Sequence, residues 1–331
     1  MSAKHSNISI FVPHIGCPNM CSFCNQRHIT GICCAPHASD VIDAVRKATT
    51  SKNYDPETTE IAFFGGSFTA INRNYMVELL KTASVFVNNG LVSGIRVSTR
   101  PDAIDDEVLQ ILKSFGVTSI ELGAQSLNDR VLRANNRGHT AKDVKKASQL
   151  IKEYGFSLGL QMMTGLYRDN DEFAIKTAEE IIELKPDTVR IYPTIVLKDT
   201  DLAALYSDNK YKPQTLEDAV ALCAKLLIMF HNANINVIRL GLHSIEKDAY
   251  MAGPWHPAFS ELCQSKIFLQ KALEILNIQG KYTIYVNKSS VSKMIGQGRS
   301  NIDSLKNLGF DCSVRPNDRL RDYQIIAERR F

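Results

Sequence analysis

The stretch Gly-Cys-Pro-Asn-Met-Cys-Ser-Phe-Cys-Asn at residues 16–25 carries three cysteines, Cys17, Cys21 and Cys24, with the spacing CxxxCxxC. It follows a short apolar run at residues 8–12, which we expect to form a buried strand. Three thiolates on one short loop can hold three corners of a four-iron cluster and leave the fourth iron without a protein ligand. Such an open iron can bind a further molecule and react with it.

Zinc is the alternative metal for these cysteines. A zinc site usually takes four ligands, and His14 and His28 flank the motif and could supply the fourth. A disulfide framework fits poorly, because a chain of 331 residues is far longer than small disulfide-rich domains. We also expect no signal peptide, since residues 1–7 are polar and the apolar run at 8–12 is short.

Length and composition indicate a globular protein with more than one part. The chain exceeds a typical single domain, so one large domain with a smaller appendage is expected. No membrane span is predicted, because the longest apolar stretch, 219–230, contains Lys225 and is too short to cross a bilayer. Thiolate-bound iron and free cysteines favour a reducing, cytoplasmic location.

The net charge of +4 is concentrated at the C-terminal end. Residues 281–331 contain ten Lys or Arg and five Asp or Glu, a net charge of +5, so residues 1–280 carry −1. The basic excess therefore belongs entirely to the last fifty residues.

The first two hundred residues alternate between strand-like and helix-like patterns. Apolar runs rich in β-branched residues occur at 8–12, 60–64, 94–98, 118–122, 156–162 and 188–192. Helical spacing occurs between them at 40–49, 75–87, 105–115, 141–154 and 171–184. Six βα units predict an α/β fold with a parallel sheet, as a partial (β/α)6 barrel that has a small α+β appendage at its C-terminal end.

Polar and glycine-rich clusters follow the predicted strands, where the carboxyl ends of parallel strands meet at one mouth. They are the cysteines, Phe64-Gly65-Gly66-Ser67, Thr99-Arg100-Pro101-Asp102, Gly123-Ala124-Gln125-Ser126 with Asn136-Arg137-Gly138-His139, Met163-Thr164-Gly165 and Tyr192-Pro193-Thr194. The glycine pair allows close backbone approach to a ligand, because glycine has no Cβ and reaches positive φ at low cost.

The cysteine motif with Phe23 before its last cysteine, followed by Gly65-Gly66, resembles the radical S-adenosylmethionine (SAM) superfamily. Four later blocks resemble the catalytic subunit of elongator and its bacterial and archaeal relatives, and more distantly oxygen-independent coproporphyrinogen oxidase. They are Ser98-Thr99-Arg100-Pro101-Asp102, Glu121-Leu122-Gly123-Ala124-Gln125-Ser126, Asn136-Arg137-Gly138-His139-Thr140 and Val189-Arg190-Ile191-Tyr192-Pro193-Thr194. The resemblance covers about residues 8–212.

The resemblance implies a [4Fe–4S] cluster on the three cysteines, with SAM chelating its open iron. It implies cofactor contacts at Gly65, Gly66, Ser67, Gln125, Arg137, Gln161 and Tyr192. Ser67 replaces the acidic residue common after the glycine pair, and Gln161 stands where the porphyrinogen relative has an aspartate. Tyr192 is equally compatible with a core position. No side chain is assigned a catalytic role.

The implied chemistry is reductive cleavage of SAM to a 5′-deoxyadenosyl radical, which removes a hydrogen atom from a substrate. A cellular electron donor such as flavodoxin or ferredoxin is implied as a partner. The group transferred is not specified, because elongator-like enzymes usually continue into an acetyltransferase domain and this sequence does not.

Three parts are expected along the chain: a radical SAM core at 1–212, an extension over the barrel at 213–279, and a basic domain at 280–331. The run Ile295-Gly296-Gln297-Gly298-Arg299-Ser300-Asn301-Ile302 resembles the KH RNA-binding module, whose GxxG loop between two helices clamps a nucleotide backbone. Arg299 stands in place of the second glycine. The predicted RNA contacts are Lys293, Gly296, Gln297, Gly298 and Arg299.

The leading hypothesis is a radical SAM enzyme that modifies RNA, with tRNA as the expected substrate. One alternative is a radical enzyme on a small molecule such as a tetrapyrrole, for which the basic tail would be structural. Another is an iron–sulfur protein that binds RNA without catalysis; the presence of Gly65, Gly66, Gln125 and Arg137 favours the enzyme over it.

Overall fold

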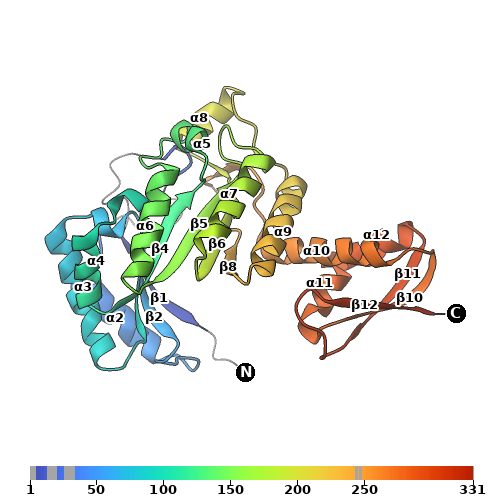
Figure 1. Ribbon diagram of the computed structural model, residues 1–331, viewed down its shortest axis with the longest axis horizontal. Helices are drawn as coiled ribbons and strands as arrows, with labels where there is room; N and C mark the ends of the chain where they lie inside the picture. Colours follow the sequence, from blue (N-terminus) through green and yellow to red (C-terminus); the bar gives the residue numbers. More distant parts are fainter. Residues whose placement is uncertain (1–4, 13–20, 26–33, 243–244, 246–247, 331) are drawn as a thin grey trace.

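The computed structural model describes residues 5–12, 21–25, 34–242, 245 and 248–330. Its main part is a parallel sheet of seven strands that lie in the order of the sequence, so every connection steps to the next strand (Figure 1). The strands are β1 (Ser6–Val12), β2 (Thr59–Gly65), β3 (Gly94–Thr99), β4 (Val117–Gln125), β5 (Ser157–Thr164), β6 (Thr188–Pro193) and β8 (Asn236–Leu240). A sheet stepped in one direction forms an open half-barrel with all carboxyl ends at one mouth.

Helices cover the outer face of this sheet. They are α2 (Ala38–Thr49), α3 (Arg73–Asn88), α4 (Asp106–Ser114), α6 (Ala141–Glu153), α7 (Asp171–Leu184) and α9 (Leu216–Asn232). The short helices α5 (Asp129–Ala134) and α8 (Asp201–Ser207) lie instead at the carboxyl-end side of the strands (Figure 1), and the chain also forms short 3-10 turns, η1 (Phe68–Ala70) and η2 (Pro101–Ala103). Alternate strand residues such as Ile61, Ile120 and Leu160 are fully buried in the apolar core that the sheet shares with these helices. The outer face thus supplies the main core.

The opposite, inner face carries charged side chains instead. Arg96 bonds Glu60 at 2.8 Å, and Arg190 bonds Glu121 at 2.7 Å. Burial raises the pKa of Glu121, and the nearby arginines oppose that shift. Burial acts the same way on Glu60, but Arg96 and hydrogen bonds hold its pKa below the ordinary value. The Glu60–Arg96 pair joins the neighbouring strands β2 and β3, and the Glu121–Arg190 pair spans from β4 to β6 across β5, so this face is built for polar contacts rather than for apolar packing.

The C-terminal end forms a smaller α+β module. Helix α10 (Phe259–Ile275) runs from the half-barrel into it (Figure 1), and the module continues with β10 (Gly280–Val286), η3 (Lys288–Ser290), α11 (Val291–Ile295), η4 (Gln297–Arg299), α12 (Ser300–Asn307), β11 (Phe310–Pro316) and β12 (Ile325–Arg330). Strand β10 lies between β11, which is parallel to it, and β12, which is antiparallel. Ile284, Met294 and Leu305 belong to a second apolar core. Another pair, β7 (Val196–Leu197) and β9 (Tyr250–Ala252), stands apart from both sheets.

The predicted fold class is confirmed, since a parallel half-barrel carries a small α+β appendage. The strand at 236–240 joins the main sheet as its seventh strand. The domain boundaries at 212 and 279 stay predictions.

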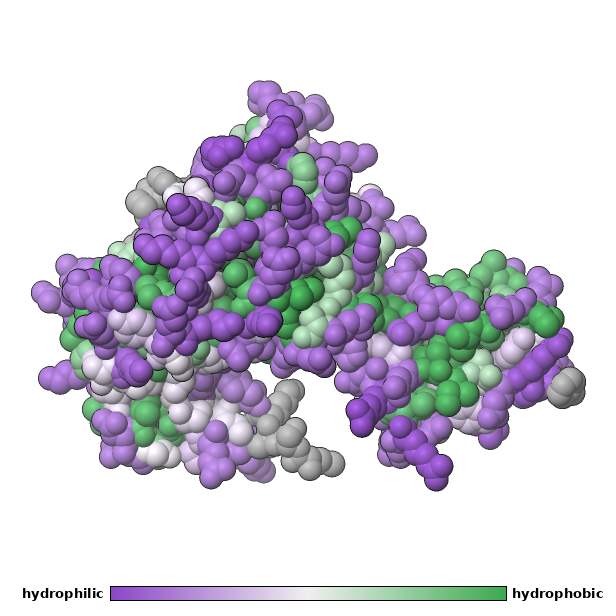
Figure 2. Space-filling model, viewed as in Figure 1, coloured by the Kyte–Doolittle hydropathy of each residue, from purple (hydrophilic) through white to green (hydrophobic). Residues whose placement is uncertain are grey.

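Figure 2 shows that hydrophilic side chains cover most of the visible half-barrel, whereas the C-terminal module shows more apolar surface. Within the described ranges, no helix combines the length and the apolar character that a bilayer crossing requires.

Candidate functional site

The glycine pair after β2 is fixed against the end of β1. Gly65 has a φ of +114°, and a Cβ on it would lie 2.6 Å from the carbonyl oxygen of Val12. The N–H of Gly66 donates to that same oxygen at 2.8 Å. Only glycine fits such an approach at such a φ. The strand end that leads to the cysteines and the glycine pair are therefore held together at the mouth.

Two of the three predicted cluster ligands lie in the short described segment 21–25. Cys21 and Cys24 are half-buried, and the N–H of Cys24 donates to the carbonyl oxygen of Cys21 at 3.0 Å, which closes a tight turn. Cys17, the third predicted ligand, lies outside the described residues, as do His14 and His28, the candidate fourth ligands of a zinc site. The turn keeps two sulfur-bearing residues close together, as a shared metal centre requires.

Residues from two distant loops hold this cysteine segment. Ser22 donates from its N–H to the carbonyl oxygen of Asn135 at 3.2 Å and from its hydroxyl to Asn135 Oδ1 at 2.9 Å. The N–H of Leu202, at the start of α8, donates to the carbonyl oxygen of Ser22 at 2.7 Å. Phe23 packs into a small apolar cluster that includes Leu202 and Tyr211. The segment is thus fixed both by hydrogen bonds and by packing.

Arg137 reaches the cysteine segment from the loop after α5. Its Nη1 lies 3.0 Å from Cys21 Sγ, and its Nη2 donates to the carbonyl oxygen of Gly123 at 2.6 Å. Its Nε is buried and has no hydrogen-bond partner among the residues that the structure describes. One guanidinium thus joins a predicted cluster ligand to the end of β4 and keeps one N–H available for a ligand.

His139 lies beside this arginine and is buried. Burial and the charge of Arg137 lower its pKa to about 4, so the imidazole is neutral at physiological pH. The Nε2 lies 3.1 Å from the carbonyl oxygen of Ala124, which can only accept, so Nε2 carries the proton. The other ring nitrogen, Nδ1, is then an acceptor that faces Arg137 Nη2 at 3.5 Å.

The predicted site residues Gln125 and Gln161 come together across β4 and β5. Gln161 donates from Nε2 to Gln125 Oε1 at 3.3 Å. Gln125 is buried with a φ of +64°, where the pairing of β4 with β5 is irregular. A non-glycine residue held at positive φ costs energy, and such strain gathers at functional sites.

Ser67 and Tyr192 have different surroundings. The Ser67 hydroxyl accepts from the N–H of Arg100 at 3.1 Å and is hydrogen-bonded to Thr99 Oγ1 at 2.8 Å, so it serves the β2–β3 junction. The backbone of residues 65–67 is therefore better placed for a ligand than this side chain. Tyr192 is half-buried on β6, and its hydroxyl accepts from Arg190 at 3.4 Å.

A family model described as the radical SAM superfamily matches residues 11–181, which is more than half of the chain. The protein belongs to the radical SAM superfamily. A second model, described as the radical SAM C-terminal domain, matches residues 186–268. The predicted superfamily is therefore confirmed, and the protein is an enzyme of this class.

Several relatives are named for elongator or for tRNA. The tRNA uridine(34) acetyltransferase of Methanocaldococcus jannaschii is 35% identical over 127 residues, 38% of this chain and 24% of that protein. Human elongator complex protein 3 is 31% identical over 198 residues, 52% of this chain and 35% of that protein. The match thus spans about a quarter to a third of these relatives. The structure of Methanocaldococcus infernus Elp3 with an N-terminal deletion has a TM-score of 0.62 at 19% identity, over 82% of this chain and 64% of that one, which shows a shared fold.

Radical SAM proteins use a [4Fe–4S] cluster and SAM, as the sequence predicted. The residues at the mouth fit these cofactors. Thiolates are the ligands of such clusters. The glycine pair leaves its backbone uncovered where a Cβ would collide, and the unpartnered Nε of Arg137 offers a donor to a carboxylate. The assignment of individual residues to the cofactors stays a prediction.

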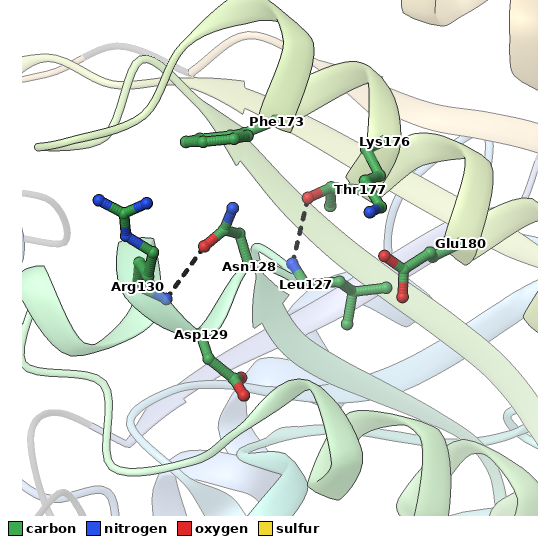
Figure 3. A pocket seen from close by; sticks show the side chains of 8 residues that line it. All are labelled: Leu127, Asn128, Asp129, Arg130, Phe173, Lys176, Thr177 and Glu180. Atoms are coloured by element: carbon green, nitrogen blue, oxygen red, sulfur yellow. Dashed lines mark hydrogen bonds between the residues drawn. The ribbon is translucent and has the colours of Figure 1, made fainter.

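Two hollows lie outside this set of residues. One of about 260 Å³ lies between α5 and α7 (Figure 3), where the N–H of Leu127 donates to Thr177 and that of Arg130 to Asn128. Its lining contains none of the predicted site residues. The other, about 480 Å³, is lined by the loops after β5 and α8 and includes Tyr211, which packs in the same cluster as Phe23.

Sequence reasoning missed the residues that hold the radical SAM cysteine segment. Asn135 is fully buried and bonds Ser22, and His139 faces Arg137. The sequence indicated the block 136–140 as functional, but it predicted a cofactor contact only for Arg137. A contact between residues more than a hundred positions apart leaves no local pattern, so nothing in the periodicity could have identified Asn135.

We expect Gly65→Ala to destabilise the protein and to abolish SAM binding, because a Cβ would meet the Val12 carbonyl. Gly90→Ala is the matched control, since Gly90 also has a positive φ, of +66°, but open space around its Cβ position. The control should lose about 1 kcal/mol of unfolding free energy, and Gly65→Ala about 1–3 kcal/mol more. Urea denaturation of both variants measures this, and equal losses would refute the close approach.

Proposed function

We propose that this radical SAM enzyme modifies RNA, with tRNA as its substrate. The observation that carries the proposal is the set of relatives named as tRNA uridine(34) acetyltransferases and elongator proteins, together with a basic C-terminal module of suitable architecture. Because the match spans only part of those relatives, the reaction on the RNA is not carried over with the substrate.

In this proposal Cys17, Cys21 and Cys24 hold the cluster, and zinc is set aside because the chain is a radical SAM protein. The backbone at Gly65, Gly66 and Ser67 receives the methionine end of SAM. The remaining contacts with SAM are made by Gln125, Arg137, Gln161 and Tyr192. When bound, the cluster and SAM would supply a 5′-deoxyadenosyl radical by reductive cleavage of a carbon–sulfur bond.

The residues of this chain position and shield that chemistry. The Gly65 approach fixes the glycine pair against the end of β1, and the Ser22–Asn135 bonds hold the described segment 21–25 that carries Cys21 and Cys24. The charged inner face of the sheet, with Glu121 and Arg190 paired, offers polar contacts to whatever enters the half-barrel. Helices on the outer face keep water away from the back of the sheet.

The C-terminal module supports RNA as the substrate class through its order of elements. Strand β10, helices α11 and α12 and strand β11 follow one another, and the sharp turn 296–299 separates the two helices. A Cβ on Gly296 would lie 2.8 Å from the N–H nitrogen of Asn301, so the turn is tight. Arg299 has a φ of +68°, the conformation that the second glycine of a GxxG loop readily adopts. This backbone conformation is compatible with the proposed KH-like turn although the residue is arginine.

The tip of this turn is accessible while its base is anchored. Gln297, Gly298 and Arg299 are exposed. Asn301 is buried and donates to the carbonyl oxygens of Ser265 at 2.9 Å and Lys293 at 3.2 Å, which ties α12 to α10 and α11. A rigid turn with an exposed arginine, in a segment of net charge +5, is suited to a phosphate backbone.

The remaining parts of the proposal concern organisation and partners. The core is assigned to residues 1–212, the extension to 213–279 and the RNA-binding part to 280–331. A flavodoxin or ferredoxin in the cytoplasm would deliver the electron. The tetrapyrrole alternative rests on the more distant resemblance to oxygen-independent coproporphyrinogen oxidase and is not the function proposed.

Anaerobically reconstituted protein should release 5′-deoxyadenosine when dithionite and SAM are added, and Cys21→Ala should release none. Cys312→Ala is the matched control, because Cys312 is a buried thiol of the C-terminal module. Mass spectrometry of tRNA nucleosides from cells with and without the protein should then reveal a modified nucleoside that depends on Cys21. An intact cluster without 5′-deoxyadenosine release would contradict the enzymatic role, and unchanged nucleosides would contradict the substrate.

Replacing Lys293 by Ala and Arg299 by Gly together should weaken RNA binding and reduce its salt dependence. The glycine removes the charge but suits the positive φ at position 299, so the turn is preserved. Each lost phosphate contact lowers the slope of log K against log salt by about 0.7 for single-stranded RNA. Binding is measured by filter retention at several salt concentrations.

The control for charge alone is Lys142→Ala with Lys146→Ala, two exposed lysines on α6 of the half-barrel. We expect this pair to change the affinity much less. Equal losses in the two double variants would show that the turn has no special role.

A further inference from the structure

We propose that Arg137 is a positioning residue that donates a hydrogen bond to the Cys21 thiolate and thereby raises the reduction potential of the cluster. The inference rests on the proposed function, because it takes Cys21 as a cluster ligand. It gives Arg137 a role toward the iron centre in addition to the predicted contact with SAM.

The guanidinium of Arg137 is fixed at two of its nitrogens. Nη1 lies 3.0 Å from Cys21 Sγ, and Nη2 donates to the carbonyl oxygen of Gly123 at 2.6 Å. The backbone N–H of Arg137 donates to the carbonyl oxygen of Leu132 at 3.0 Å, which anchors the loop to α5. The approach of the guanidinium to the sulfur is therefore fixed by these contacts, unlike that of a mobile arginine at the surface.

His139 contributes to this orientation without adding charge. Its Nε2–H is bonded to the Ala124 carbonyl oxygen, which leaves Nδ1 as an acceptor 3.5 Å from Arg137 Nη2. Because the imidazole is neutral, the positive charge nearest to Cys21 in this contact network is the guanidinium itself. The donor to the sulfur is thus a cation with a fixed orientation.

A cation that donates to a ligand sulfur changes the redox balance of an iron–sulfur cluster. Reduction adds one electron, part of which resides on the thiolate sulfurs, so a donor stabilises the reduced form more than the oxidised one. The attraction is strong where water is scarce, and the buried Nε indicates such surroundings. Loss of the charge should therefore lower the potential and make the cluster harder to reduce.

This role is separable from the anchoring of the segment. Ser22 is held through both its N–H and its hydroxyl by Asn135, and its carbonyl oxygen accepts from Leu202. Those contacts keep the backbone in place without any contribution from Arg137. A variant at Arg137 should consequently retain the cysteine turn while it loses the donor to the sulfur.

The test is an EPR-monitored redox titration of anaerobically reconstituted protein, without SAM. Arg137→Gln should shift the midpoint potential to a more negative value than in the wild type. Arg137→Lys, which keeps the charge but loses the planar donor, should fall between the two. Arg133→Gln is the matched control, because it removes an exposed arginine from α5 in the same part of the chain and should leave the potential unchanged.

An Arg137→Gln cluster with the wild-type potential would overturn the inference, as would an equal shift in Arg133→Gln. If Arg137→Gln binds no iron, Arg137→Lys decides: a potential below that of the wild type supports the role, and an unchanged potential refutes it. Failure of the cluster assignment is a different result, since wild-type protein would then show no [4Fe–4S] signal to titrate. Failure of the enzymatic role or of the RNA substrate would leave the titration itself unaffected.

Discussion

The site depends on how the cysteine segment is tied to the rest of the half-barrel. The Val12 carbonyl, at the end of β1, accepts from Gly66 and leaves no room for a side chain at Gly65. Further along, Ser22 is bonded twice to Asn135 and once to Leu202. These are mostly backbone contacts, and together with the packing of Phe23 they fix where the described segment with Cys21 and Cys24 lies. A cofactor that needs several ligands at one point requires such a frame.

The outer face of the sheet contributes to stability, and the inner face carries the polar groups available for function. The outer face packs apolar side chains against helices, and this core supports the seven parallel strands, whose carboxyl ends lie on one side of the sheet. The inner face pairs Arg96 with Glu60 and Arg190 with Glu121, which places charge where a substrate would enter. Because the apolar core lies behind the sheet, the residues at the mouth are free to serve chemistry. Gln125 at this mouth is held at a positive φ, so its backbone is strained there.

Much of this architecture could be predicted from the sequence, because the strands are short runs rich in apolar, β-branched residues and the helices keep the helical spacing of apolar residues. The helix at 171–184 was predicted with the observed bounds. Strand β12 was missed, since only Ile325 and Ala327 of its six residues pack toward the module core. The contact of Arg137 with Cys21 was beyond sequence reasoning, as it joins residues 116 positions apart. Ser67 stays a predicted cofactor contact, and the bonds of its hydroxyl to Thr99 and Arg100 were not indicated by the sequence.

The central claim is that the cysteines of this chain hold an iron cluster with one open position, at which SAM binds. Electron–nuclear double resonance on the reduced protein, with SAM carrying ¹⁵N in its amino group, tests it most directly. The account predicts a ¹⁵N hyperfine coupling to the cluster in the wild type. A well-formed [4Fe–4S] cluster that shows no such coupling in the presence of saturating labelled SAM would contradict it.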